Sequence, residues 1–226
     1  MKTYNDFMNE NTPRIKNGVF SRELNKVKSK VVSRDLSPQK FTDIIAGVLD
    51  NWSIEVDKFV DPNVDSGTVN VDAGFVEPDD ESESGVDLNV VFSPEDKTIQ
   101  LDAKSWKVFV NLVSDALVHE FLHSAQKSSR GSKSQRELTG KELKGVNSND
   151  SDFSYYGNQD EMEAFAVNAA SELKRKFGSK KRVMKKLSNY SKITLKDSPS
   201  FDSYLEHFKK DSILMKKFVK MVIKYL

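Results

Sequence analysis

The sequence predicts an α+β fold in which a small, largely antiparallel sheet leads into a central helix, with further helices before and after them. Two patterns predict this fold. Between residues 68 and 101, apolar residues alternate with polar ones in the segments TVNVDAGFV, VDLNVVF and TIQL, as in short strands with one buried face. From 103 to 126, apolar residues recur at three- and four-residue steps, as on the buried face of a helix.

The N-terminal part of the chain, residues 1–60, is expected to be a helical segment. Ser37 is a favoured N-cap residue and Pro38 suits the first helical turn. The apolar residues that follow recur at helical spacing. The acidic stretch EPDDESESG, residues 77–85, separates the first two strands and is expected to be a turn.

Asp102 is the expected N-cap of the central helix. After that helix, a polar stretch rich in Ser, Lys and Gly is typical of a surface loop, and a second helix is expected from about 160 to 176. Two further helix starts, Ser198-Pro199 and Asp211-Ser212, lie nearer the C-terminus. We therefore expect a core at residues 61–178 and a basic helical C-terminal segment at 179–226 that packs on it.

Composition limits the chemistry that the chain can use. It contains no cysteine, so disulfides and thiolate metal ligands are excluded, and any metal ion must be bound by His, Asp or Glu. No stretch approaches the roughly 20 apolar residues that span a bilayer, and the polar N-terminus lacks the apolar run of a signal peptide. We therefore expect a cytoplasmic protein without a membrane partner.

Two of the three histidines lie four residues apart in the central helix, in the sequence HEFLH: His119, Glu120 and His123. Residues four apart share a helix face, about 5 to 6 Å apart at Cβ, so both imidazoles can bind one ion. A metal ion such as Zn²⁺ lowers the pKa of a coordinated water, and a neighbouring carboxylate can take its proton as the water attacks a carbonyl group. The alternative is a helix with two solvated histidines. The intervening glutamate and the preceding strands favour the metal site.

A catalytic zinc site usually has three protein ligands and one open position, so a third donor is expected downstream. Glu161 and Glu163 lie at the start of the second helix, and residues two apart diverge by about 200° around a helix axis. Glu163 borders the apolar stripe of this helix, whereas Glu161 shares its side with polar residues. Because a buried carboxylate requires a cation, Glu163 is the expected third ligand, with Glu161 as the alternative.

HEFLH followed about forty residues later by EMEAFA resembles the zincin metallopeptidases of the gluzincin type. The pattern is also similar to small HExxH proteins encoded by tailed bacteriophages. The resemblance covers residues 68 to about 176, and it implies that the core at 61–178 is zincin-like.

The resemblance also implies a role for each residue of the site. His119, His123 and Glu163 would bind Zn²⁺, and Glu120 would act as the general base. In the thermolysin-like pattern an Asp four residues after the ligand glutamate orients a ligand histidine. In this chain that position holds Val167, so the acid is missing from its usual place.

The other two candidate side chains are Tyr156 and His207. Tyr156 lies just before the second helix and could donate to the oxyanion that forms during peptide hydrolysis. Packing in the core or in a loop is the alternative for this ring. His207 is expected to be a surface or capping residue without a role in the site.

The run KRKFGSKKRVMKK, residues 174–186, makes the last part of the chain basic. It lacks the interleaved aromatic residues of a base-stacking platform and any recognisable nucleic-acid-binding motif. We therefore expect no nucleic-acid partner. The segment is expected to form a solvated helical face or to contact an acidic protein partner.

These features predict a zinc-dependent metallopeptidase that hydrolyses peptide bonds of a peptide or protein substrate. One alternative is a non-catalytic or structural component of a virus particle, with virion proteins as partners. The missing acid favours this alternative, and the presence of Glu120 speaks against it. Another is a regulator that cleaves or binds one specific partner, such as a repressor. If the chain is phage-encoded, its expected location is the host cytoplasm or the virion.

Overall fold

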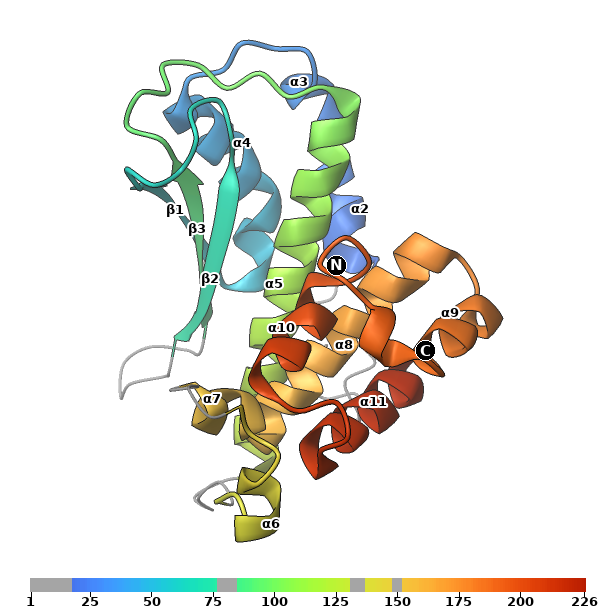
Figure 1. The fold of residues 1–226 in the computed structure, drawn as a ribbon. Coiled ribbons are helices and arrows are strands. Elements are labelled where there is room, and N and C mark those ends of the chain that lie inside the picture. Colours follow the sequence, from blue (N-terminus) through green and yellow to red (C-terminus); the bar gives the residue numbers. More distant parts are fainter. Residues whose placement is uncertain (1–17, 77–84, 131–136, 148–151) are drawn as a thin grey trace. The chain divides into compact units, whose positions relative to one another are not determined.

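A computed structural model describes residues 18–76, 85–130, 137–147 and 152–226 (Figure 1). Within these residues the fold is α+β, with ten α-helices and one three-stranded sheet. The chain divides into two compact units, residues 1–125 and 126–226. None of the helices in the described ranges is long and apolar enough to cross a membrane.

The first unit contains the sheet and the helices that precede and follow it. The helix start expected at Ser37 is confirmed, because its side chain accepts a hydrogen bond from the backbone amide of Lys40 and Pro38 occupies the first turn. The elements are α2 (Val19–Asn25), α3 (Lys28–Val31), α4 (Pro38–Leu49), the 3-10 turn η1 (Asp50–Trp52), β1 (Ile54–Val60), β2 (Asn70–Val76), β3 (Gly85–Phe92) and α5 (Ala103–Arg130), whose last residues, from Gln126 on, belong to the second unit.

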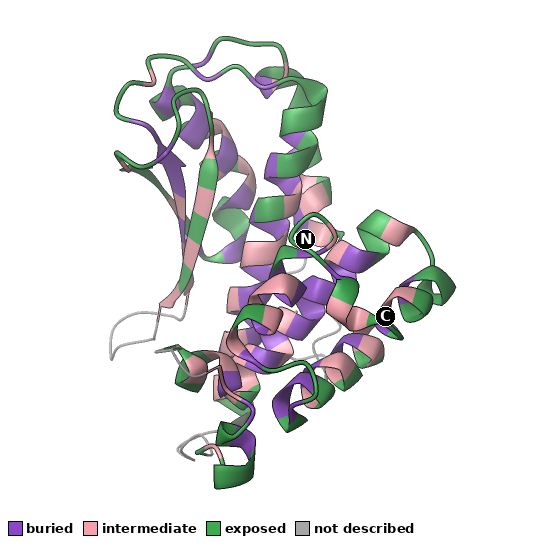
Figure 2. Ribbon diagram, in the orientation of Figure 1, coloured by how far each residue is buried: buried purple, intermediate pink, exposed green. Residues whose placement is uncertain are grey.

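The sheet has the strand order β1-β3-β2. β2 pairs with β3 in the antiparallel direction and β1 pairs with β3 in parallel, so the sheet is mixed and the expectation of a largely antiparallel sheet is wrong. β1 also lies within the segment that was expected to be helical. It is an edge strand in which apolar and polar residues alternate only from Ile54 to Asp57, because Lys58, Phe59 and Val60 are all exposed. So short an alternation does not distinguish a strand from the end of a helical segment. Figure 2 shows β3 as the more buried strand and β2 as largely exposed or half-buried.

The third expected strand, TIQL, does not join this sheet. Ile99 instead forms a single bridge with Leu36, and Leu101 forms one with Val32. The alternation correctly indicated an extended segment with one buried face, because Ile99 and Leu101 are both buried. Alternation does not identify the pairing partner of a strand. The acidic turn expected at 77–85 lies, except for Gly85, outside the described residues.

α5 begins at the expected N-cap. The carboxylate of Asp102 accepts a hydrogen bond from the backbone amide of Ser105 at 2.6 Å, and hydrogen bonds to Ser105 lower the pKa of Asp102. The ring of Phe41 on α4 lies 6.2 Å from that of Phe92 on β3 and 5.2 Å from that of Phe109 on α5, measured between centroids. α4 therefore lies between the sheet and α5 in the first unit.

The second unit is helical, and α8 (Gln159–Phe177) is its most buried helix (Figure 2). The two C-terminal helix starts are confirmed, since Ser198 and Ser212 each accept a backbone hydrogen bond at the first turn of their helices. These helices, α10 (Pro199–His207) and α11 (Ile213–Tyr225), both pack on α8. The elements are α6 (Gly140–Leu143), α7 (Phe153–Gly157), α8 (Gln159–Phe177), α9 (Lys180–Leu187), the 3-10 turn η2 (Tyr190–Lys192), α10 (Pro199–His207) and α11 (Ile213–Tyr225).

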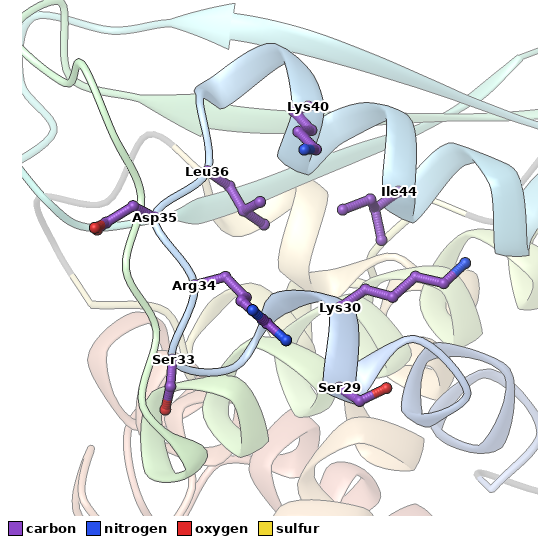
Figure 3. Close-up of a pocket in the computed structure, with 8 residues that line it drawn as sticks. All are labelled: Ser29, Lys30, Ser33, Arg34, Asp35, Leu36, Lys40 and Ile44. Atoms are coloured by element: carbon purple, nitrogen blue, oxygen red, sulfur yellow. The ribbon is translucent and has the colours of Figure 1, made fainter.

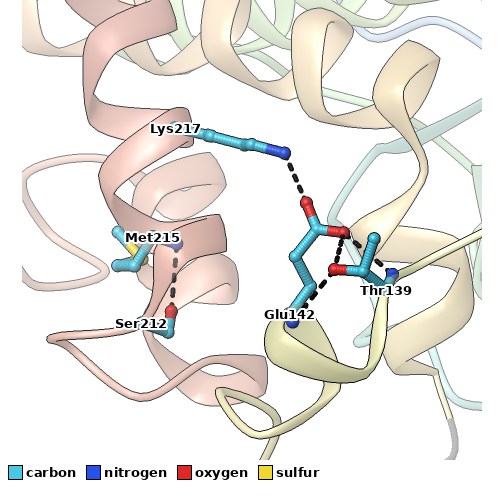
Figure 4. A network of polar contacts seen from close by, with 5 residues as sticks. All are labelled: Thr139, Glu142, Ser212, Met215 and Lys217. Atoms are coloured by element: carbon cyan, nitrogen blue, oxygen red, sulfur yellow. Dashed lines mark hydrogen bonds and ion pairs between the residues drawn. The ribbon is translucent and has the colours of Figure 1, made fainter.

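The buried carboxylate of Glu142 links α6 to α11 through an ion pair (Figure 4). Glu142, which is 3% exposed, accepts hydrogen bonds from the backbone amide and the hydroxyl of Thr139 at 2.9 and 2.8 Å, and so completes a capping box. Its other oxygen forms an ion pair with Lys217 on α11. The pair compensates the charge of Glu142 within the second unit.

Candidate metal centre

α5 brings the three residues of the HEFLH sequence together in the first unit. One candidate ligand atom from each of His119, Glu120 and His123 lies within 4.8 Å of those of the other two. The two imidazole rings lie 4.6 Å apart between centroids and are inclined by 79°. His119 is buried, and Glu120 and His123 are half-buried. The four-residue spacing thus places both rings on one face of the helix, as predicted.

The two turns of α5 that carry the HEFLH sequence also carry apolar side chains, and the packing of these side chains fixes the direction of the face with the two histidines. Leu117, Phe121 and Leu122 are each at most 2% exposed. The ring of Phe121 stacks on that of Phe20 of α2, with 5.5 Å between centroids. Because these neighbours are fixed in the core of the first unit, the backbone that carries both histidines is fixed as well.

Glu163 lies on α8 in the second unit, and three donors hold its carboxylate. The hydroxyl of Tyr225 and the Nζ of Lys224, at 3.2 Å, donate to Oε1, and the Nε2 of Gln126 donates to Oε2 at 3.3 Å. Burial raises the pKa of Glu163, but these hydrogen bonds outweigh it and leave the pKa below its usual value. Burial and the neighbouring Glu163 raise the pKa of Tyr225 to about 12. Glu163 is therefore ionised at neutral pH, and Tyr225 remains a donor.

Burial does not rank Glu163 above Glu161 in the structure. Both side chains are half-buried. Glu163 keeps 26% of its side-chain surface exposed, whereas Oε2 of Glu161 is shielded from solvent. Burial raises the pKa of Tyr204, and the charge of Glu161 raises it further, so this carboxylate lies near the core of the second unit. The choice of Glu163 as third ligand stays a prediction.

The ring of Tyr156, on α7, belongs to an aromatic cluster of the second unit. It stacks on the ring of His207 at 3.8 Å and 22°, and lies 5.2 Å from the ring of Phe165 and 5.6 Å from that of Tyr204. The backbone oxygen of Tyr156 accepts a hydrogen bond from the Tyr204 hydroxyl at 2.8 Å. The ring is thus packed, as the alternative interpretation of Tyr156 requires. The function of its hydroxyl stays a prediction.

The basic run at residues 174–186 forms the end of α8 and most of α9. Its cationic side chains are mostly exposed. Lys186 pairs with Asp197 at 3.0 Å and lies 5.5 Å from the ring centroid of Phe177. The guanidinium of Arg175 donates a hydrogen bond to the hydroxyl of Ser171 at 3.0 Å, so this cation also has a partner within the second unit.

The sequence did not indicate the partners of Glu163. Gln126 follows the HEFLH sequence by three residues, and Lys224 and Tyr225 lie about sixty residues after Glu163. No spacing rule connects these positions before the fold is known. No family model, curated protein or solved structure matches the chain.

Proposed function

We propose that the chain is a zinc-dependent metallopeptidase with a zincin-like core, in which His119 and His123 bind the metal ion. The observation that carries this proposal is the convergence of the candidate ligand atoms of His119, Glu120 and His123 in the C-terminal half of one packed helix. Imidazole nitrogens and carboxylate oxygens are donors that zinc accepts, and the chain offers no thiolate. The third ligand is proposed to come from α8, as Glu163 with Glu161 as the alternative.

Glu120 is the proposed general base. When bound, a zinc ion polarises the scissile carbonyl and makes water acidic enough to react near neutral pH. Glu120 accepts the proton of the attacking water and passes it to the amine nitrogen as the peptide bond breaks. Its half-buried side chain lies beside both imidazoles, where it can perform this transfer. The proposed substrate is a peptide or protein.

Metal analysis of the purified protein tests the site directly. We expect about one zinc per chain in the wild type and less than about a tenth of that in His119→Ala and in His123→Ala, because two protein ligands do not hold zinc tightly. His207→Ala is the matched control, since it removes the third histidine from a different helix. Zinc retained by His123→Ala, or a wild type that stays metal-free when zinc is supplied, would contradict the proposal.

Tyr156 is the proposed donor to the oxyanion. If its hydroxyl has this function, Tyr156→Phe should lower kcat by about a hundredfold, because this is the typical loss when one such donor is removed. Phenylalanine preserves the stacking on His207, so the variant should keep its fold. Steady-state kinetics on a cleaved peptide measure kcat of the wild type and of the variant. An unchanged kcat would assign the ring to packing alone.

One observation favours a second candidate function, a structural or non-catalytic component of an assembly. The position four residues after Glu163 holds Val167, which is buried, so no carboxylate from that position orients a histidine. A structural zinc site is closed by four protein ligands, whereas a catalytic site keeps one open position. Cobalt-substituted protein whose visible spectrum does not respond to added azide would favour the structural function.

A further inference from the structure

The first unit also contains a basic groove beside α4. One cavity of about 700 Å³ lies between α3 and the start of α4, and Figure 3 shows the side chains that line it. A second cavity of about 270 Å³ shares Lys30, Lys40 and Ile44 with the first, so the two are continuous along α4. We call these two cavities the α4 groove.

Three cations border the α4 groove, and they come from three successive parts of the chain. Lys30 lies on α3, Arg34 in the connection and Lys40 on α4, and all three are exposed. In the described part of the chain, none of these side chains forms an ion pair. Figure 3 shows the guanidinium of Arg34 directed into the space between the two helices, while the carboxylate of Asp35 points away from it. Asp43, an exposed residue of α4, also lines the second cavity, so the groove carries three cations against two carboxylates and keeps a surplus of positive charge.

The floor of the α4 groove is apolar. Leu36 and Val27 are each 5% exposed, and Ile44 and Val48 are half-buried. No aromatic residue lines either cavity. Single-stranded nucleic acid is typically held by stacking its bases on aromatic rings as well as by cations, and the groove offers cations but no such ring. A peptide with both acidic and apolar side chains matches the floor and the rim.

The connection between α3 and α4, which carries Arg34 and forms one wall of the α4 groove, is fixed before any ligand binds. Ser33 has a left-handed backbone with φ of 59°, and its amide donates a hydrogen bond to the carbonyl of Leu101 at 2.9 Å. Leu36 and Ile99 exchange two backbone hydrogen bonds at 3.1 and 2.6 Å. Arg34 thus lies between two residues, Ser33 and Leu36, whose backbones are hydrogen-bonded to the segment that precedes α5. A fixed wall reduces the ordering cost of binding.

We propose that the α4 groove binds an acidic, partly apolar segment of a protein substrate at a distance from the peptide bond that is cut. Carboxylates of this segment pair with Lys30, Arg34 and Lys40, and its apolar side chains contact Leu36 and Ile44. The description of the bound protein as a substrate rests on the proposed peptidase function. Binding to the groove does not depend on that function.

One substrate is long enough to contact both the α4 groove and the metal centre at His119 in the first unit. α5 begins two residues after Leu101, which pairs with the groove wall, and His119 follows 16 residues after Ala103. At 1.5 Å per residue this separation is about 24 Å along the helix. An extended peptide covers the same distance in about seven residues.

A binding measurement with a defined probe tests the proposal. The probe is a fluorescein-labelled peptide of about ten residues in which Glu and Leu alternate, and the protein is the full chain with Glu120→Gln in zinc-containing buffer, so that the probe is not cut. Fluorescence anisotropy reports the affinity. Reversing the three groove charges together, with Lys30→Glu, Arg34→Glu and Lys40→Glu, should weaken binding at least about tenfold, because attraction becomes repulsion.

The matched control reverses three other exposed lysines of the first unit, Lys58, Lys97 and Lys107, to Glu. It changes the net charge equally and should keep the affinity within about twofold. If the triple groove variant is not folded by circular dichroism, Arg34→Gln alone should still weaken binding about threefold. Equal weakening in both triple variants, or equal affinity for a Gln-Leu peptide, would overturn the proposal.

Two further measurements separate this proposal from others. Stronger binding of a single-stranded DNA of about twenty nucleotides than of the peptide would make the groove a nucleic-acid site and overturn the proposal.

The second measurement uses the enzyme with Glu120 unchanged. Fusing the acidic segment to a cleavable peptide should raise its kcat/KM at least about fivefold, and the groove variant should lose this gain. Groove-dependent binding without any cleavage would refute the peptidase function while leaving the groove intact as a peptide site.

Discussion

Glu120→Gln is expected to lower kcat/KM for a cleaved peptide by about a thousandfold while the protein retains its zinc. Glutamine has nearly the same shape as glutamate but cannot accept a proton at neutral pH, and a positioned general base contributes about 10²- to 10⁴-fold. His119 and His123 are unchanged in this variant, so metal binding should persist. Kinetics and metal analysis on the same preparation test both parts of the prediction.

Glu95→Gln is a suitable control for this experiment, because it removes the same charge from an exposed position of the first unit. It should leave kcat/KM within about twofold. Two results would refute the proposed role of Glu120. Full activity in Glu120→Gln would exclude it as the base, and loss of zinc together with activity would make Glu120 a metal ligand.

The helix starts could be predicted from the sequence because their causes are local. Ser37, Asp102, Ser198 and Ser212 each accept a hydrogen bond from a backbone amide within three residues. A cap therefore depends on a few consecutive residues and is visible in the sequence. The parallel pairing of β1 with β3 is not local, since the partners are about thirty residues apart. Only the three-dimensional structure reveals it.

The same distinction applies to the candidate site. The four-residue spacing of His119 and His123 on one helix was sufficient to predict that their rings would lie together. The partners of Glu163 come from both ends of the second unit, as Gln126, Lys224 and Tyr225, and no periodicity connects them with it. The groove beside α4 was also missed, because it forms only when α3 and α4 fold next to each other.

The identity of the third ligand is the prediction with the next largest effect. We expect Glu163→Ala to lower zinc affinity by more than about a hundredfold, since even residues that merely orient a ligand contribute 10- to 100-fold. Glu161→Ala should leave the affinity within about threefold. Competition with a chelating dye measures both affinities. The opposite pattern would identify Glu161 as the ligand.

Tyr225→Phe distinguishes the two functions that Glu163 can have. Both oxygens of Glu163 already accept hydrogen bonds, but a carboxylate has about four lone-pair positions, so metal binding and these bonds are compatible. If Tyr225 orients a ligand, removing its hydroxyl should lower zinc affinity by about 10- to 100-fold. If Glu163 only fastens α11 to α8, the same change should lower the free energy of unfolding by about 1 kcal/mol and leave zinc affinity unchanged. Because Phe preserves the ring, neither result can be attributed to lost packing.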